Sequence, residues 1–360
     1  MKIDILKNIT VSFRQNDTKK GTNSTLPGVK ISRGMTMKKI LTFILLASLT
    51  AGVFALPNLL KKEQFGANSI DNLEIDLSSE DIDFKETYDS SAIEVEIYCN
   101  NKKYAPEVSV SGSTLYIESQ KRSFGFFEAI DNPTGFRCTV IVYVPQKKDF
   151  EEIVIGTSSG DINVHRVLSA KSIISLKASS GDISSEKGLF ADTIKVSASS
   201  GDIELYNIDA DDFTVSTSSG DIVIEKFTGG TGDIQSTSGD IDVKDFATEY
   251  AEFKATSGHI NVKKLDCDYF DVNTTSGGIS IELTNGPAAT SSASCTSGDI
   301  ELYVPMRAKF SVQASCTSGS FRDRFNNNRM NPRGSVTQDY NGGGSLIKIR
   351  TTSGDITLDY

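Results

Sequence analysis

Apolar and polar residues alternate along much of the chain, on both sides of a recurring Ser-Gly pair. In "EEIVIGTSSGDINV", Ile153, Ile155, Ile162 and Val164 alternate with polar or small residues on either side of Gly160. Alternation with a period of two indicates β-strands with one buried face. Serine and glycine are turn residues, and glycine admits the positive φ that a tight corner can require. Each such stretch therefore predicts a strand, a corner and a second strand.

The same pattern recurs ten times between residues 151 and 360. A serine precedes the glycine in all ten copies, an aspartate follows it in seven, and isoleucine stands two residues after it in nine. Successive glycines lie 19 to 21 residues apart, with a final interval of 35; they are Gly160, Gly181, Gly201, Gly220, Gly239, Gly258, Gly277, Gly298, Gly319 and Gly354. A fixed period near twenty predicts one structural unit that stacks on its neighbours, because no unit can bury its apolar face alone.

We therefore expect an all-β fold, a right-handed parallel β-solenoid (β-helix) with one coil per Ser-Gly-Asp repeat of about 20 residues. An antiparallel meander would show the same alternation, but near-identical coils favour parallel stacking in register. At about 4.8 Å per coil, ten coils would form a rod roughly 50 Å long.

The aspartate after each glycine is the position of the repeat that could carry chemistry. By alternation it points outward, next to its equivalents on neighbouring coils, and the seven copies are Asp161, Asp182, Asp202, Asp221, Asp240, Asp299 and Asp355. One interpretation is structural, with each carboxylate accepting backbone N–H groups in the corner. The other is a row of Ca²⁺ ions, which take several oxygen ligands. His259, Gly278 and Ser320 interrupt the row, which favours a structural corner and no cofactor.

The segment "MKKILTFILLASLTAGVFALP", which begins at Met37, predicts export from the cytoplasm. Lys38 and Lys39 precede an uncharged run over Ile40–Leu56. This fits a signal peptide with a cleavage point after Ala55, and equally a retained membrane anchor at the short end of spanning length. The basic residues before the run favour an extracytoplasmic C-terminal part, secreted or membrane-anchored in a bacterial cell envelope.

The chain accordingly divides into four expected parts. Residues 1–36 are a polar tail or a mis-assigned start, and 37–60 are the leader. Residues 66–150 are strand-rich but less regular, and predict a β cap over the open end of the solenoid. Within them, "SSEDIDF" looks like a worn copy of the repeat, and "KRSFGFFEAIDNPTG" is either a hydrophobic plug under the cap or an exposed contact loop. Residues 151–360 are the repeats, with an insertion at 320–345.

The insertion "SFRDRFNNNRMNPRGSVTQDYNGGGS" is locally basic on an acidic protein. It supplies candidate partner contacts, four arginines and two aromatic anchors: Arg322, Arg324, Arg329, Arg333, Phe325 and Tyr340. Insertions in repeat proteins often lie on the binding face. One interpretation is a lid over the open C-terminal coils. The other is a contact site for anionic envelope polymer or lipid headgroups, with arginines pairing to phosphates.

Composition argues against two other classes of function. The formal net charge of −10 makes nucleic acid an unsuitable partner. Neither His165 nor His259 lies in a nucleophile motif, and the aspartates form a line instead of a catalytic cluster, so we do not expect an enzyme. The five cysteines show no CxxC metal spacing. Cys295 and Cys316 occupy the same inward slot on what we take to be adjacent coils, where Cβ atoms ~4.8 Å apart favour two buried thiols over a disulfide.

The repeated "SGDI" coils, the entry "VYVPQKKDFEEIVIGTSSGDI" and the late "ELYVPMRAKFSVQASCTSGSF" resemble the bacterial "putative adhesin" family, a domain of unknown function with a β-helical fold. The resemblance covers roughly residues 68–360. It implies an envelope or surface setting for a chain with such a leader, and no established activity.

We therefore expect a non-enzymatic surface module that acts in binding or as a scaffold, in the manner of an adhesin. Its partner would be an unknown protein or an anionic envelope polymer, with contact to the membrane through the leader. A polysaccharide-acting β-helix enzyme and an envelope-stress accessory protein are the alternatives. A further alternative is an ice- or crystal-binding face, because a hydroxyl ladder stands two residues before the glycines: Ser158, Ser179, Ser199, Ser218, Thr237 and Thr256.

Overall fold

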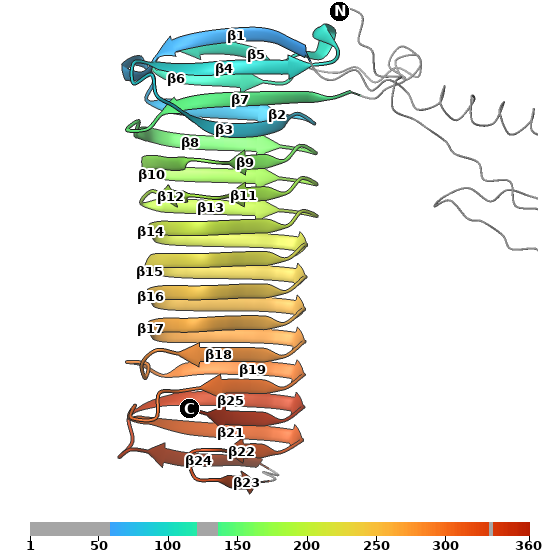
Figure 1. The fold of residues 1–360 in the computed structure, drawn as a ribbon. Helices are drawn as coiled ribbons and strands as arrows, with labels where there is room; N and C mark the ends of the chain where they lie inside the picture. The colour runs from blue at the N-terminus through green and yellow to red at the C-terminus, as the bar shows by residue number, and fades with distance from the viewer. Residues whose placement is uncertain (1–57, 121–135, 331–333) are drawn as a thin grey trace, which may run out of the picture. The chain divides into compact units, whose positions relative to one another are not determined.

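The computed structural model describes residues 58–120, 136–330 and 334–360, which lie within one compact unit spanning Ala55–Tyr360 (Figure 1). The described residues are all-β, apart from 3₁₀ turns at Ala67–Ser69 and Lys102–Tyr104. Among them, no helix is long and apolar enough to span a membrane. Residues 37–57 of the predicted leader, the Phe-rich segment 121–135 and Arg333 lie outside the described residues, whereas residues 58–60 belong to β1 (Asn58–Gly66).

Four long coils at the centre of the rod define the fold. They are β14 (Ile203–Ser219), β15 (Ile222–Ser238), β16 (Ile241–Ser257) and β17 (Ile260–Ser276). Each pairs in parallel with the next and in register, so that Ile203, Ile222, Ile241 and Ile260 form one buried column. Parallel stacking of equivalent residues is a β-solenoid, and it excludes the antiparallel meander for these coils. The right-handed sense of winding stays a prediction.

Shorter strands continue the stack in both directions (Figure 1). On one side lie β8 (Phe150–Thr157), β9 (Ile162–Val164), β10 (Val167–Ala178), β11 (Ile183–Ser185), β12 (Gly188–Phe190) and β13 (Thr193–Ala198). On the other side lie β18 (Ile279–Leu283), β19 (Ser291–Ser297) and β20 (Ile300–Tyr303). All of these pair in parallel with the neighbouring coils.

The N-terminal end departs from sequence order. The coil of β2 (Asn72–Leu77) and β3 (Asp81–Thr87) lies between β8–β9 and an outer coil of β6 (Thr114–Glu118) and β7 (Cys138–Pro145). Three antiparallel strands finish this end: β1 (Asn58–Gly66) on β4, β4 (Ala92–Cys99) on β7, and β5 (Glu107–Ser111) on β6. The expected cap region thus contains two parallel coils of the solenoid itself.

The worn copy "SSEDIDF" occupies the place in the stack that its sequence predicts. Ile82 pairs with Ile162, and Glu80 stands where other coils carry the corner glycine. The Glu80 side chain is fully buried, and its carboxylate accepts hydrogen bonds from the backbone N–H groups of Ser78 and Ser79 and from the hydroxyl of Ser119. A buried carboxylate is tolerated here because several donors replace its lost water.

The C-terminal end departs from sequence order in the same way. The last coil of the chain, β25 (Ser345–Ser353) with β26 (Ile356–Asp359), lies between β19–β20 and the coil of β21 (Phe310–Ser318) and β22 (Phe321–Asp323). The expected adjacency of Cys295 and Cys316 is therefore wrong, because Thr351 stands between them: it pairs with Cys295 on one side, and β25 pairs with β21 on the other. Both cysteines are nonetheless free and buried, as predicted.

Part of the insertion closes this end. β24 (Gly334–Tyr340) pairs antiparallel with β21, and β23 (Asn328–Met330) forms a hairpin with β22. An open parallel edge exposes unpaired N–H and C=O groups that can pair with another chain. Antiparallel strands at both ends of the described stack therefore cover the edges that the parallel coils would leave open.

The core is filled by complementary side-chain volumes in neighbouring columns. Phe213, Phe227 and Phe246 stack with ring centroids 4.9 and 4.6 Å apart. Gly232 stands in the column of Phe213, where a Cβ would lie 2.4 Å from the Phe246 ring. A larger residue at that position would clash, so the glycine provides the volume that the rings occupy.

Candidate functional site

The corner glycines are explained by the close approach of one coil to the next. A Cβ on Gly220 would lie 2.2 Å from the carbonyl oxygen of Gly201, and the other nine corner glycines show equivalent contacts of 1.8–2.1 Å. Gly220 does not lie in the left-handed region, so positive φ is not its reason. Positive φ of 148–153° applies to Gly277, Gly298, Gly319 and Gly354.

The aspartates of the corner form a ladder that connects the coils. Asp161 Oδ1 accepts from the backbone N–H of Asp182, Asp182 from Asp202, and Asp202 from Asp221, each at 2.9 Å. Asp221 and Asp240 continue the series, at 2.8 and 2.7 Å. The carboxylates therefore bond to the neighbouring coil, whereas an Asx turn would bond within its own.

Two of the three interruptions preserve the ladder by other means. His259 Nδ1 accepts from the N–H of Gly278 at 3.0 Å. Ser320 is a donor, and its N–H and hydroxyl both bond to Asp355 Oδ1. These bonds hold the pKa of Asp355 below its usual range, with the N–H bond the largest cause. Gly278 is the third interruption, and it has no side chain that could accept a hydrogen bond from the backbone N–H of Asp299.

A buried row three residues before the glycines completes the corner. Thr217 Oγ1 donates to the carbonyl of Gly201 at 3.3 Å, and Thr274 Oγ1 to that of Gly258 at 3.2 Å. Thr351 Oγ1 donates to Gly298 at 3.1 Å. Small hydroxyl side chains at this position therefore satisfy glycine carbonyls that the stack buries. No cluster of three or more metal-ligating side chains occurs among the described residues.

The arginines of the insertion lie at the hairpin of β22 and β23, and the structure gives two of them local partners. Arg324 Nε lies 3.3 Å from Asp359 Oδ2, and Arg329 Nε donates to Ser320 Oγ at 3.2 Å. Arg322 is exposed and pairs with Arg329 across the hairpin. These three arginines all remain exposed.

The two aromatic anchors of the insertion pack at the end of the core. Tyr340 is 4% exposed and stacks on Phe310 with centroids 4.7 Å apart. Phe325 is half-buried and packs edge-on against Phe310, Tyr340 and Tyr360. The packing favours the interpretation of the insertion as a lid, since apolar rings close the end of the core. Burial leaves little of Tyr340 to contact a partner, whereas a partner contact by Phe325 stays a prediction.

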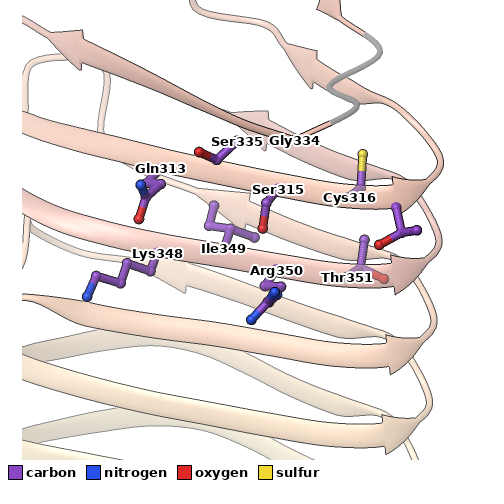
Figure 2. Close-up of a pocket in the computed structure, with 10 residues that line it drawn as sticks. Gln313, Ser315, Cys316, Gly334, Ser335, Lys348, Ile349, Arg350 and Thr351 are labelled. Atoms are coloured by element: carbon purple, nitrogen blue, oxygen red, sulfur yellow. The ribbon is translucent and has the colours of Figure 1, made fainter.

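A groove of ≈ 760 Å³ lies over the strand segments that precede the Ser-Gly corners of β21 and β25, beside β24, which pairs along β21 (Figure 2). Arg322, in contrast, follows its corner. Lys348 and Arg350 of β25 stand in it beside Gln313 and Ser315 of β21 and Ser335 of β24. None of the described residues that line it is acidic. Neither cation forms an ion pair with a carboxylate in the described ranges. We call this the C-terminal groove.

A second groove of ≈ 550 Å³, the central groove, lies over β14–β17. Its lining includes Ser216, Gln235, Lys254 and Asn273, each four residues before a corner glycine. Ser294 and then Arg350 follow Asn273 in the same register. The two grooves therefore lie on one face of the solenoid. We call the outward residues of the strand segments before each corner the outer face.

A family model matches two stretches of the chain, residues 70–188 and 185–359, with the description Toastrack DUF4097. The chain belongs to the Toastrack DUF4097 family. The match agrees with the resemblance to the adhesin-like domain of unknown function that the SGDI repeats carry. A search of curated proteins finds no relative of this Toastrack chain.

Solved structures are similar to this chain at low identity and low TM-score. A "putative adhesin" from Parabacteroides distasonis is 14% identical, with 83% of this chain and 97% of that chain covered and a TM-score of 0.46. A "Putative lipid binding protein" from the same species is 17% identical, with coverages of 83% and 96% and a TM-score of 0.40. A "putative adhesin" from Bacteroides fragilis is 12% identical, with coverages of 83% and 96% and a TM-score of 0.36. These likenesses carry no argument about function.

The C-terminal groove of this Toastrack chain was missed by inference from sequence. Lys348 and Arg350 occupy ordinary outward positions of an alternating strand, "SLIKIRTTS". One signal was available. The last repeat is the only one with basic residues at both of two outward positions, six and four residues before the glycine. Their surroundings depend on the placement of β25 next to β21, which the order of repeats does not suggest.

Proposed function

We propose that the chain is a non-enzymatic binding and scaffold module of a bacterial cell envelope, adhesin-like in its mode of action. The observation that carries the proposal is the outer face: both grooves lie on it, and in-register columns of side chains connect them along a rigid stack. A solenoid presents such a surface without induced folding, because each coil is fixed by its neighbours. The winding would be right-handed, with one Ser-Gly-Asp corner per coil.

An extracytoplasmic location is supported by a disulfide as well as by the leader. Cys99 and Cys138 lie directly opposite each other on the antiparallel strands β4 and β7, and are disulfide-bonded. Disulfides persist in oxidising compartments and are rare in the cytosol. The leader would deliver the chain to such a compartment and could retain it at the membrane.

The partner that suits the outer face is an anionic envelope polymer. Lys348 and Arg350 place two uncompensated positive charges in the C-terminal groove of a protein whose formal net charge is −10. Charge complementarity attracts and orients a polyanion at such a local patch. The alternative of a polysaccharide-cleaving enzyme would require carboxylates or a base facing the groove. The described lining of the C-terminal groove supplies hydroxyls, amides and cations instead.

The test is cosedimentation of purified residues 55–360, one compact unit, with isolated bacterial envelopes. We expect the protein to sediment with envelopes and to be released by salt, because charged contacts are screened. The Lys348→Gln/Arg350→Gln variant should lose most of this retention. The matched variant Arg322→Gln/Arg324→Gln, which removes two exposed cations from the hairpin, should keep it. A wild-type protein that stays in the supernatant at low salt would refute the binding function.

A further inference from the structure

The outer face carries more detail than a charged patch, and we propose that its ligand is a linear polysaccharide with both acidic and neutral sugars. The strand would lie along the solenoid axis, over both grooves. This inference rests on the proposed binding function and assigns it a ligand class and an orientation.

The first argument is the continuity of one column of side chains. Ser216, Gln235, Lys254 and Asn273 pair in register across the central groove. Ser294 follows, and Arg350 and Ser315 carry the column into the C-terminal groove. Six steps of about 4.8 Å give roughly 29 Å of surface. A site of this length suits an extended polymer and not a compact small molecule.

The second argument is the different chemistry of the two grooves. Side chains that line the central groove hold carboxylates two residues before them on the same strands: Gln235 Nε2 donates to Asp233 at 2.9 Å, and Asn273 Nδ2 donates to Asp271 at 2.9 Å. Lys254 pairs with Glu252 in the same way. These groups offer paired donors and acceptors, which match sugar hydroxyls and acetamido groups.

A polymer with a negative charge on every unit would be repelled by Asp233, Glu252 and Asp271, the carboxylates beside the central groove. The C-terminal groove has the opposite preference, because Lys348 and Arg350 stand there without a carboxylate in the described lining. Arg350 can bind a carboxylate through two parallel N–H groups, and Lys348 contributes a compact charge. The face therefore favours a strand in which acidic sugars are interspersed with neutral ones.

The third argument is an aromatic pair on the same face, four residues before Lys254 and Asn273 along β16 and β17. The rings of Tyr250 and Tyr269 stack with centroids 5.0 Å apart and an interplanar angle of 9°. They stand eight residues before their corner glycines, on the outer face, and both are half-buried. Tyrosine offers an apolar ring and a polar hydroxyl together, which suits the apolar C–H faces and hydroxyls of a pyranose.

The experiment is calorimetric titration of residues 55–360 with hyaluronate oligosaccharides, whose acidic sugars alternate with neutral N-acetylated sugars. Neutral dextran oligosaccharides and polyphosphate are the comparators. We expect hyaluronate to bind most tightly. Lys348→Gln/Arg350→Gln should weaken its binding about tenfold or more. Asn273→Ala should weaken hyaluronate binding severalfold and leave polyphosphate binding unchanged. Arg322→Gln/Arg324→Gln is the control for loss of charge outside the face.

The outcomes separate this inference from the proposed function. Polyphosphate binding as tight as hyaluronate, with Asn273→Ala silent, would overturn the polysaccharide assignment in favour of a simple charge patch. Equal binding of dextran would overturn the role of the acidic sugars. If hyaluronate fails while envelopes still retain the protein, the ligand class is wrong and the binding function stands. Circular dichroism melting of each variant excludes loss of fold as the cause.

Discussion

Oδ1 of Asp202 accepts a hydrogen bond of 2.9 Å from the backbone N–H of Asp221, one coil further along the solenoid. The two residues are nineteen apart in sequence and one step apart in the stack. The carboxylate thus satisfies a donor of the next corner, and the same bond recurs from coil to coil. The recurrence of Ser-Gly-Asp along the chain follows from this bond, because each corner must fit the corner beside it.

The ladder predicts a cost for losing one carboxylate and no response to calcium. Asp202→Ala leaves the Asp221 N–H without its acceptor, and should lower the free energy of unfolding by about 1 kcal/mol. Asp209→Ala, at an exposed position of the same coil for which no such bond is seen, is the matched control. Thermal melts with and without Ca²⁺ measure both effects. A large stabilisation of the wild type by Ca²⁺ that Asp202→Ala abolishes would instead establish a metal row.

Acid should weaken the ladder in a defined direction. The pKa of Asp355 is lowered in the folded state by its bonds from Ser320. A carboxylate with a depressed folded pKa stabilises the protein above its unfolded value, about 3.9, and loses that contribution as the pH falls through the folded value. Asp355→Asn should therefore flatten the stability profile below about pH 4. A profile parallel to that of the wild type would contradict this role.

Gly220→Ala tests the close approach of the coils. Its Cβ would meet the Gly201 carbonyl oxygen at 2.2 Å, so the coils must separate and the cost should reach about 3 kcal/mol or more. Gly112→Ala is the control for conformational strain alone: Gly112 has φ of 62° and open space around it, and should cost only about 1–2 kcal/mol. Urea denaturation of both variants measures the difference. Equal costs would show that steric contact between coils is not the reason for the glycine.

Gly278→Asp should stabilise the protein, because it supplies the acceptor that the Asp299 N–H lacks in the ladder. The new Cβ would meet His259 Nδ1 at 3.2 Å and Cε1 at 3.7 Å and the Asp299 carbonyl oxygen at 3.4 Å, and the imidazole can adjust. We expect a gain of about 1 kcal/mol, seen as a rise of about 2 °C in the melting temperature. Gly278→Ala, which adds the Cβ without the carboxylate, should give no rise. A drop with both variants would mean that the corner has no room there.

The Cys99–Cys138 disulfide should contribute measurably to stability. The double variant Cys99→Ser/Cys138→Ser should lose about 2–4 kcal/mol, and reductant should lower the melting temperature of the wild type and of Cys267→Ser but not that of the double variant. Cys267→Ser is the control: burial raises the pKa of the Cys267 thiol to about 12, so it remains protonated and unreactive at neutral pH. If reductant lowered the melting temperature of the double variant by the same amount, the effect could not come from loss of the Cys99–Cys138 disulfide.

Much of the solenoid could be predicted from the sequence, because the repeat determines the local structure of each coil. Ile203 and Ile222 are buried and paired as their positions in the repeat require. The ladder was foreseen as backbone bonding by aspartate, but its direction was not, since an Asx turn and a bond to the next coil demand the same residue. The order in which the coils stack could not be predicted from the sequence, because β25 carries the same repeat as the other coils.

The candidate site depends on that stacking order, which explains why sequence favoured the arginine hairpin instead. Arg322 and Arg324 stand out because their segment breaks the period. Lys348 and Arg350 keep the period, and become neighbours of Gln313, Ser315 and Ser335 only when β25 lies beside β21 and β24 closes the end. The pairing of Cys99 with Cys138 escaped prediction for the same reason, since antiparallel β4 and β7 are not part of the repeat.

The central claim is that the outer face, and not the hairpin, receives the partner. Hydrogen–deuterium exchange of residues 55–360, measured with and without soluble anionic polysaccharide extracted from envelopes, tests it most directly. The account predicts slowed exchange of backbone amides in β25 and β21, around Lys348, Arg350 and Ser315, with a smaller effect around Asn273. It predicts unchanged exchange across the hairpin of β22 and β23. Protection confined to Arg322–Met330, with β25 unaffected, would contradict it.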